Sequence, residues 1–147
     1  MKKIPFLFLS VVLLCSCSKE PLFELTGTWK LTHIVGVSDE AWGNEILYAS
    51  DYIRYEYTSY DILYKFNESN ALTVLGETNQ IDLYFGHDAG KYMFSLMIVD
   101  ERIAHIIIDD DVFYTSNFSK DKIRPDINNL IMSDKQNRYI YSFTRIH

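Results

Sequence analysis

Apolar and polar residues alternate in short segments along most of this chain, and this period of two constrains the fold more than any other feature. In residues 60–66, YDILYKF, four aromatic or aliphatic side chains share one face, and Asp61 and Lys65 lie on the other. Such alternation is typical of half-buried β-strands, and helical periodicity is poor throughout. Phe, Tyr and Trp, which suit pleated surfaces, make up 15% of the residues. The sequence therefore predicts an all-β domain.

Nine segments have strand character, and short polar turns connect most of them. These segments are 25–35, 60–66, 71–75, 81–85, 92–99, 103–108, 112–118, 130–132 and 139–146. Short connections predict antiparallel neighbours, and an open sheet would expose its edge strands. We therefore predict an antiparallel up-and-down barrel of eight or nine strands, with a sandwich as the alternative. Residues 119–129 are expected to form a loop, and residues 36–60 a loop, a short helix or, at 52–58, an extra strand.

The first residues have the order of an export signal. Lys2 and Lys3 precede an apolar stretch, Ile4 to Leu14, which is too short to span a bilayer. The sequence Leu14-Cys15-Ser16-Cys17 then resembles the lipobox of bacterial lipoproteins. The resemblance implies cleavage after Ser16 and attachment of diacylglycerol and palmitate at Cys17. Lipidation at Cys15 is the alternative, but Leu14 is too large for the preceding position.

These features divide the chain into a signal peptide at 1–16, a lipidated tether at 17–24 and a barrel domain at 25–147. The residue after Cys17 is Ser18 rather than the Asp that favours retention in an inner membrane, so we expect an outer-membrane location. The run Ser18-Lys19-Glu20 weakly resembles the surface-export signal of Bacteroidetes lipoproteins. A solvated tether explains it equally well, and the sequence does not indicate which face of the membrane the domain occupies.

Both ends of the domain resemble the lipocalin-like domains found in Bacteroidetes lipoproteins. Gly27-Thr28-Trp29 stands where such domains have a Gly-x-Trp at the start of their first strand, and residues 139–145 resemble their aromatic last strand. The resemblance implies that Gly27 and Trp29 are structural and that Arg145 stacks on Trp29 when the barrel closes. Alternation also places Trp29, Leu31, His33 and Val35 on one face. The alternative is an ordinary core Trp29 and a solvated Arg145.

An eight-stranded barrel is either filled by side chains or holds one small ligand. The candidate pocket residues are inward-facing aromatics: Trp29, Tyr64, Phe66, Tyr92, Phe94, Tyr114, Tyr141 and Phe143. The first function hypothesis is a non-enzymatic envelope lipoprotein that binds a small hydrophobic molecule. The second is a filled barrel that binds a protein or glycan at the cell surface through its Tyr-rich segment, residues 41–60.

The sequence gives little support to other classes of function. The net charge is −6, and no basic stripe suggests a nucleic-acid partner. Cys15 and Cys17 are the only cysteines, so none remains for a disulfide, and no motif predicts a catalytic residue, a cofactor or a metal site. His33 and His105 are expected to face inward as core residues, and His87 to lie in a solvated turn. The run Asp109-Asp110-Asp111 is expected to be a solvated hairpin turn rather than a calcium site.

Overall fold

We analysed a computed structural model of the chain, which describes residues 25–38, 40–42, 47–100, 102–115 and 128–147. The predicted signal peptide, Cys17 and the tether lie outside these residues, and so does nearly all of the predicted loop at 119–129. Within the described ranges, no helix is both long and apolar enough to cross a membrane.

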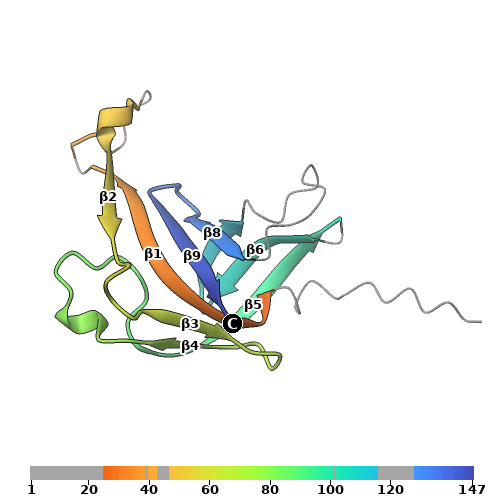
Figure 1. Cartoon of the computed structure of the whole chain (residues 1–147). Coiled ribbons are helices and arrows are strands. Elements are labelled where there is room, and N and C mark those ends of the chain that lie inside the picture. The colour runs from red at the N-terminus through yellow and green to blue at the C-terminus, as the bar shows by residue number, and fades with distance from the viewer. Residues whose placement is uncertain (1–24, 39, 43–46, 101, 116–127) are drawn as a thin grey trace, which may run out of the picture.

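The described chain is all-β, and eight of its strands close into an antiparallel barrel (Figure 1). The sheet order is β2-β1-β3-β4-β5-β6-β7-β8-β9, and β1 also pairs with β9, which closes the ring. This confirms the predicted fold class, a barrel consistent with a lipocalin-like one, and excludes the sandwich. The strands are β1 Gly27–Val37, β2 Tyr52–Glu56, β3 Leu63–Phe66, β4 Ala71–Leu75, β5 Gly90–Val99, β6 Arg102–Ile108, β7 Asp111–Thr115, β8 Asn129–Asp134 and β9 Tyr139–Ile146. Two 3-10 helices, η1 Ala49–Asp51 and η2 Thr78–Gln80, lie between strands.

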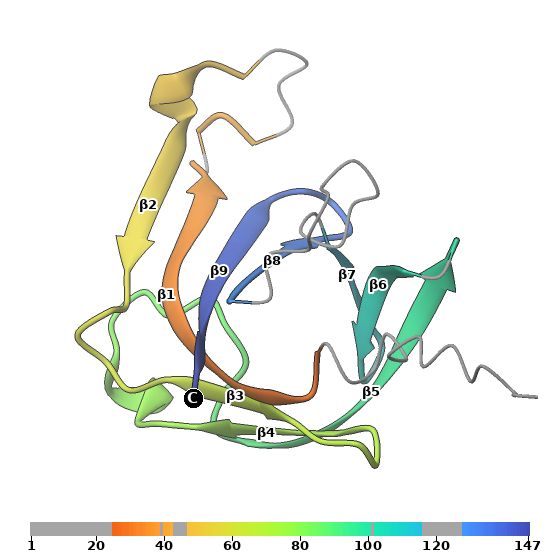
Figure 2. The same cartoon turned by 45° about the vertical axis from the view of Figure 1, so that its right-hand side comes forward.

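The ninth strand, β2, lies outside the closed ring. Along one edge of β1, the first half pairs with β3 (Thr28 opposite Lys65) and the second half pairs with β2 (Val35 opposite Arg54). β1 is therefore long enough to pair with β3 and then with β2 along the same edge. Figures 1 and 2 show β2 and η1 standing apart from the rest of the barrel. Of the alternatives for residues 36–60, an extra strand near 52–58 is the one that forms, together with the short helix η1.

The predicted strand at 81–85 is wrong. Residues 76–89 form an irregular β4–β5 connection that begins with η2, and Leu83 in its middle has φ +57°. A left-handed residue cannot continue a strand, because it turns the next peptide out of the ladder direction. Alternation of apolar residues alone does not show this turn, since Leu rarely adopts such a φ.

A bulge in β1 changes which of its side chains face inward. The register against β9 shifts between Leu31 and His33, so Ile34, rather than His33, faces the buried Tyr141. The prediction that His33 and Val35 share the face of Trp29 is therefore wrong. The extra residue, Thr32, donates its hydroxyl to the carbonyl of Ser142 at 2.9 Å. One inserted residue inverts the alternation beyond it, because side chains repeat every two residues.

At one end, the barrel is closed by Trp29. Its ring is fully buried, its Nε1 donates to the Leu25 carbonyl at 2.8 Å, and the Arg145 guanidinium carbon lies 4.3 Å from its ring centroid. Arg145 also donates to the Thr26 carbonyl at 3.0 Å. The contact implied by the family resemblance is thus present, and Arg145 is not a solvated terminal residue. Gly27 has φ +138°, and a Cβ there would lie 3.0 Å from the guanidinium, so both backbone and space favour glycine.

Candidate functional site at the other end of the barrel

Three connections surround the end of the barrel opposite Trp29. They are the β4–β5 connection (76–89), the β6–β7 turn (109–110) and the β8–β9 turn (135–138). They lie together because consecutive turns of an up-and-down meander alternate between the two ends. We call this end the cavity end.

The β4–β5 connection is held against the strands by three tyrosine hydroxyls. Tyr57 donates to the Leu83 carbonyl at 2.6 Å, and Tyr141 donates to the Phe85 carbonyl at 3.1 Å. The hydroxyl of Tyr64 accepts the backbone N–H of His87 at 2.9 Å. Polar backbone groups that would otherwise pair in a strand are therefore satisfied by side chains from β3, from β9 and from the residue just after β2.

The connection also packs closely on itself. Tyr84 donates its hydroxyl to the His87 carbonyl at 2.8 Å, and this ring passes directly over Gly86. A Cβ at Gly86 would lie 2.3 Å from the Tyr84 hydroxyl and 3.0 Å from that of Tyr64. Only glycine fits this close approach, so the path of the segment depends on it.

Burial keeps these tyrosines protonated. It raises the pKa of Tyr64 and that of Tyr57 to about 12, and it also raises the pKa of Tyr84 and of Tyr141. Near neutral pH the four hydroxyls are therefore neutral hydrogen-bonding groups that order the segment.

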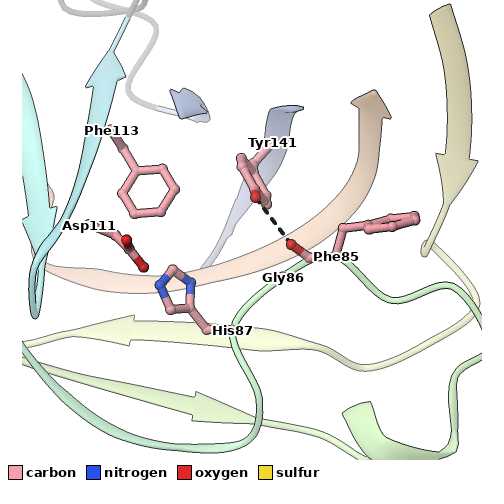
Figure 3. Close-up of a pocket in the computed structure, with 6 residues that line it drawn as sticks. All are labelled: Phe85, Gly86, His87, Asp111, Phe113 and Tyr141. Atoms are coloured by element: carbon pink, nitrogen blue, oxygen red, sulfur yellow. Dashed lines mark hydrogen bonds between the residues drawn. The ribbon is translucent and has the colours of Figure 1, made fainter. Parts of the chain in front are cut away.

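A cavity of about 130 Å³ remains between this connection and the strands (Figure 3). It is lined by Phe85, Gly86 and His87 from the connection, Asp111 and Phe113 from β7, and Tyr141 from β9. Asp111 and Phe113 are two residues apart on one strand and so share its inward face. The alternation of β7 thus places a carboxylate at the rim and an aromatic ring one layer below it.

His87 forms one wall of the cavity. Its ring centroid lies 5.2 Å from that of Tyr92, 5.4 Å from that of Phe113 and 5.9 Å from that of Tyr64. Burial among these rings lowers the pKa of the imidazole, and the carboxylates of Asp111, Asp109 and Asp88 oppose that shift. The imidazole is therefore neutral at pH 7. The prediction of a solvated His87 is wrong, because the connection that carries it folds inward instead of forming a surface turn.

A larger groove adjoins the cavity and shares Asp111, Phe113 and Tyr141 with it. Its volume is about 440 Å³, and its other lining residues are Asp110, Val112, Asp134, Lys135 and Gln136. An Asp134 carboxylate oxygen accepts the backbone N–H of Tyr139 at 2.9 Å, which fixes this side chain at the start of the β8–β9 turn. The cavity thus adjoins a groove between two hairpin turns.

Of the eight predicted pocket residues, Tyr141 lines this cavity. Five are core side chains: Trp29, Tyr64, Phe66, Phe94 and Phe143. Tyr92 packs beside His87 and donates its hydroxyl to the Asp88 carbonyl. Tyr114 is 37% exposed on the outer face of the barrel, and its ring packs against that of His105. The predictions that Tyr114 and His105 face inward are therefore wrong.

The residues missed by sequence reasoning are His87, Asp111 and Phe113. The sequence analysis chose Tyr114 instead of its neighbour Phe113 as an inward-facing residue, because the segment 112–118 has aromatic residues at both odd and even positions. Its opposite neighbour in β6, the buried Ile106, lies in an apolar run that shows no alternation. Only the pairing of β6 with β7 reveals which face of each strand is buried.

The predicted acidic turn comprises two of its three residues, because Asp111 begins β7 and lines the cavity instead. Asp109 and Asp110 form the exposed β6–β7 turn, and Asp109 accepts the N–H of Met93 at 3.1 Å. Among the residues that the structure describes, no three His, Cys, Asp or Glu side chains gather as a metal site would require. The cavity lining thus combines aromatic rings, one imidazole and one carboxylate.

Searches for similar proteins find no matching family model, no matching curated protein and no matching solved structure.

Proposed function

We propose that this protein is a non-enzymatic lipoprotein of the bacterial cell envelope whose barrel binds one small molecule at its cavity end. The observation that carries the proposal is the cavity bounded by His87, Asp111, Phe113 and Tyr141, which adjoins a solvent-facing groove. Pockets that combine apolar walls with a few converging polar groups are the usual form of small-molecule sites.

The size of the cavity restricts the ligand. Sites for drug-sized molecules typically enclose about 300–1,000 Å³, whereas the inner cavity encloses about 130 Å³. Below it the barrel is filled by core side chains, including Trp29, Tyr64 and Phe143. A long acyl chain has no room along the axis. The ligand is therefore a compact molecule, with one small group in the cavity and the remainder in the groove.

The lipid anchor is proposed to lie on the side of the barrel away from this site. Gly27, which begins β1 at the Trp29 end, lies ten positions after Cys17. A fully extended chain of that length spans at most about 35 Å. An outer-membrane anchor at Cys17 would hold the Trp29 end nearest the bilayer and leave the cavity end facing the solution.

Native mass spectrometry of the full chain, produced in a bacterial envelope and released in detergent, tests the binding proposal. We expect a small mass excess over the lipidated protein that disappears on denaturation. The variant Phe113→Ala should lose it, and the matched variant Tyr114→Ala, which removes a neighbouring aromatic from the outer face, should keep it. A protein without the excess, both as isolated and after incubation with an envelope extract, would contradict the proposal.

Metabolic labelling with a palmitate analogue tests the anchor separately. Cys17→Ser should abolish the label and Cys15→Ser should retain it, because Ser16 provides the small residue before the cleavage site. Loss of label from Cys15→Ser alone would instead assign the anchor to Cys15.

A second candidate function is a surface interaction through the aromatic residues around β2. Trp42, Tyr48 and Tyr52 are 40%, 67% and 43% exposed, and aromatic residues are enriched at protein interfaces. Tyr55 and Tyr57 of the same segment are instead packed against the barrel. A photo-crosslinker at Tyr48 should capture a partner on cells, and one at the exposed Met93 should not. Equal yields at the two positions would argue against this function.

A further inference from the structure

The walls of the cavity are aromatic and nearly perpendicular. The rings of Phe113 and Tyr141 have centroids 5.7 Å apart and planes at 84°, and the His87 ring lies 5.4 Å from Phe113. Figure 3 shows these three rings around one space. The faces of aromatic rings carry partial negative charge, so the parts of these rings that remain open to the cavity favour a positively charged guest.

A formal negative charge lies at the same place. The Asp111 carboxylate lies at the rim, on the inward face of β7 and close to the His87 ring in Figure 3. No lysine or arginine of the described residues forms an ion pair with it. The neighbouring imidazole is neutral near pH 7 and does not offset its charge. The charge of Asp111 is therefore available to a ligand.

The cavity also has a suitable size. A protein cavity of about 150 Å³ is large enough to hold benzene, and this one encloses about 130 Å³. That space is enough for a compact group such as a methylated ammonium head. The rest of such a ligand would extend into the groove, where Asp110, Asp134 and Lys135 are available for polar contacts.

We propose that the cavity end binds the ammonium head of a small organic cation in the space beside Phe113, Tyr141 and His87, with Asp111 as its counter-ion. This inference rests on the proposed function and names its ligand class. Aromatic faces with an adjacent carboxylate bind quaternary ammonium groups well, because cation–π attraction and charge pairing add without requiring a hydrogen-bond donor on the ligand. The carboxylates of Asp110 and Asp134 repel a phosphate next to the ammonium, so the ligand is a free cation and not a phospholipid headgroup.

Isothermal titration calorimetry on the full chain in a non-ionic detergent tests the inference. The probes are choline, its neutral isostere with a quaternary carbon in place of nitrogen, and phosphocholine. We expect choline to bind saturably, at least about tenfold more tightly than the isostere and than phosphocholine, a ratio that corresponds to about 1.4 kcal/mol.

Variants locate the binding site. Asp111→Asn should weaken choline about fivefold to tenfold and leave the isostere unchanged, since it removes charge and keeps shape. Phe113→Leu should weaken choline by a similar factor. The matched control is Asp109→Asn, which removes a carboxylate from the adjacent turn, outside the cavity. It should change choline affinity less than about twofold, because the Asp109 carboxylate accepts the Met93 N–H in the turn and does not line the cavity.

Each contrary result has a definite meaning. Equal or tighter binding of the isostere would overturn the cation inference while leaving a small-molecule site in place. Tighter binding of phosphocholine would overturn the free-cation assignment and indicate a lipid headgroup. Choline binding that Asp111→Asn does not weaken would place the site elsewhere. The cation inference fails if none of the three probes binds at concentrations up to about 50 mM, which would reveal even weak affinities. In that case, mass spectrometry of the envelope-derived protein decides whether the proposed function fails as well.

Discussion

The hydroxyl of Tyr64 offers the clearest test of how the β4–β5 connection is held in place. The side chain is fully buried, and its oxygen accepts the His87 N–H at 2.9 Å while lying 3.4 Å from the Tyr84 hydroxyl and 3.3 Å from Nδ1 of His87. Tyr64→Phe keeps the ring and its packing against Phe143 but leaves that N–H without an acceptor. An unsatisfied buried donor costs about 1–3 kcal/mol.

We therefore expect Tyr64→Phe to lower the free energy of unfolding by about 2 kcal/mol. For a domain of this size that corresponds to a fall in Tm of about 6–10 °C. Urea unfolding of the full chain, followed by tryptophan fluorescence, measures the change, and an unchanged m-value would show that the unfolded state is the same.

The matched control is Tyr92→Phe. Its hydroxyl donates to the Asp88 carbonyl at 2.7 Å, but this bond is exposed, so water replaces it and the loss should stay below about 0.5 kcal/mol. If the two variants lose the same stability, buried tyrosine hydroxyls do not hold the connection, and the reasoning is refuted.

Three further predictions concern both ends of the barrel. Arg145→Met should lower the free energy of unfolding by about 2–3 kcal/mol in urea, because it removes the cation over Trp29 and the hydrogen bond to the Thr26 carbonyl. The control Arg54→Met breaks an exposed ion pair with Glu56 and should cost less than about 1 kcal/mol. Equal losses in the two variants would contradict this prediction. Gly86→Ala should lower Tm by several degrees and weaken ligand binding, since its Cβ would displace Tyr84; a variant with wild-type Tm and affinity would show that the segment adjusts freely. The pKa of His87 is lowered in the folded state, so the stability contributed by its neutral imidazole is complete above about pH 6.5 and is lost as the pH falls below that value. Urea titrations between about pH 7 and pH 5 should therefore show that the free energy of unfolding falls more steeply in the wild type than in His87→Asn. Parallel slopes would be the contrary result.

The sequence predicted the barrel because its information is local and repeated. Strands such as 71–75 and 139–146 alternate cleanly and end at polar turns, and Gly27, Trp29 and Arg145 mark where the first and last strands meet. Closure follows once consecutive strands pair, since the remaining edges of β1 and β9 satisfy each other.

The candidate site was harder to predict because it depends on departures from that regularity. The bulge at Thr32 reverses the facing of His33 and Ile34, and the left-handed Leu83 converts an apparently good strand into an inward-folding connection. Neither Thr nor Leu is a residue type from which a bulge or a left-handed backbone can be predicted. The hydrogen bonds that compensate come from Tyr57, Tyr64 and Tyr141, which are distant in sequence from the segment they hold.

The central claim is that a compact molecule occupies the space between Phe113, Tyr141 and His87, and a high-resolution crystal structure of the full chain isolated from a bacterial envelope tests it most directly. The account predicts continuous density for a small group against these rings, beside the Asp111 carboxylate, with the β4–β5 connection in the position described. Ordered water alone in that space, or an acyl chain running through the barrel past Tyr64, would contradict it.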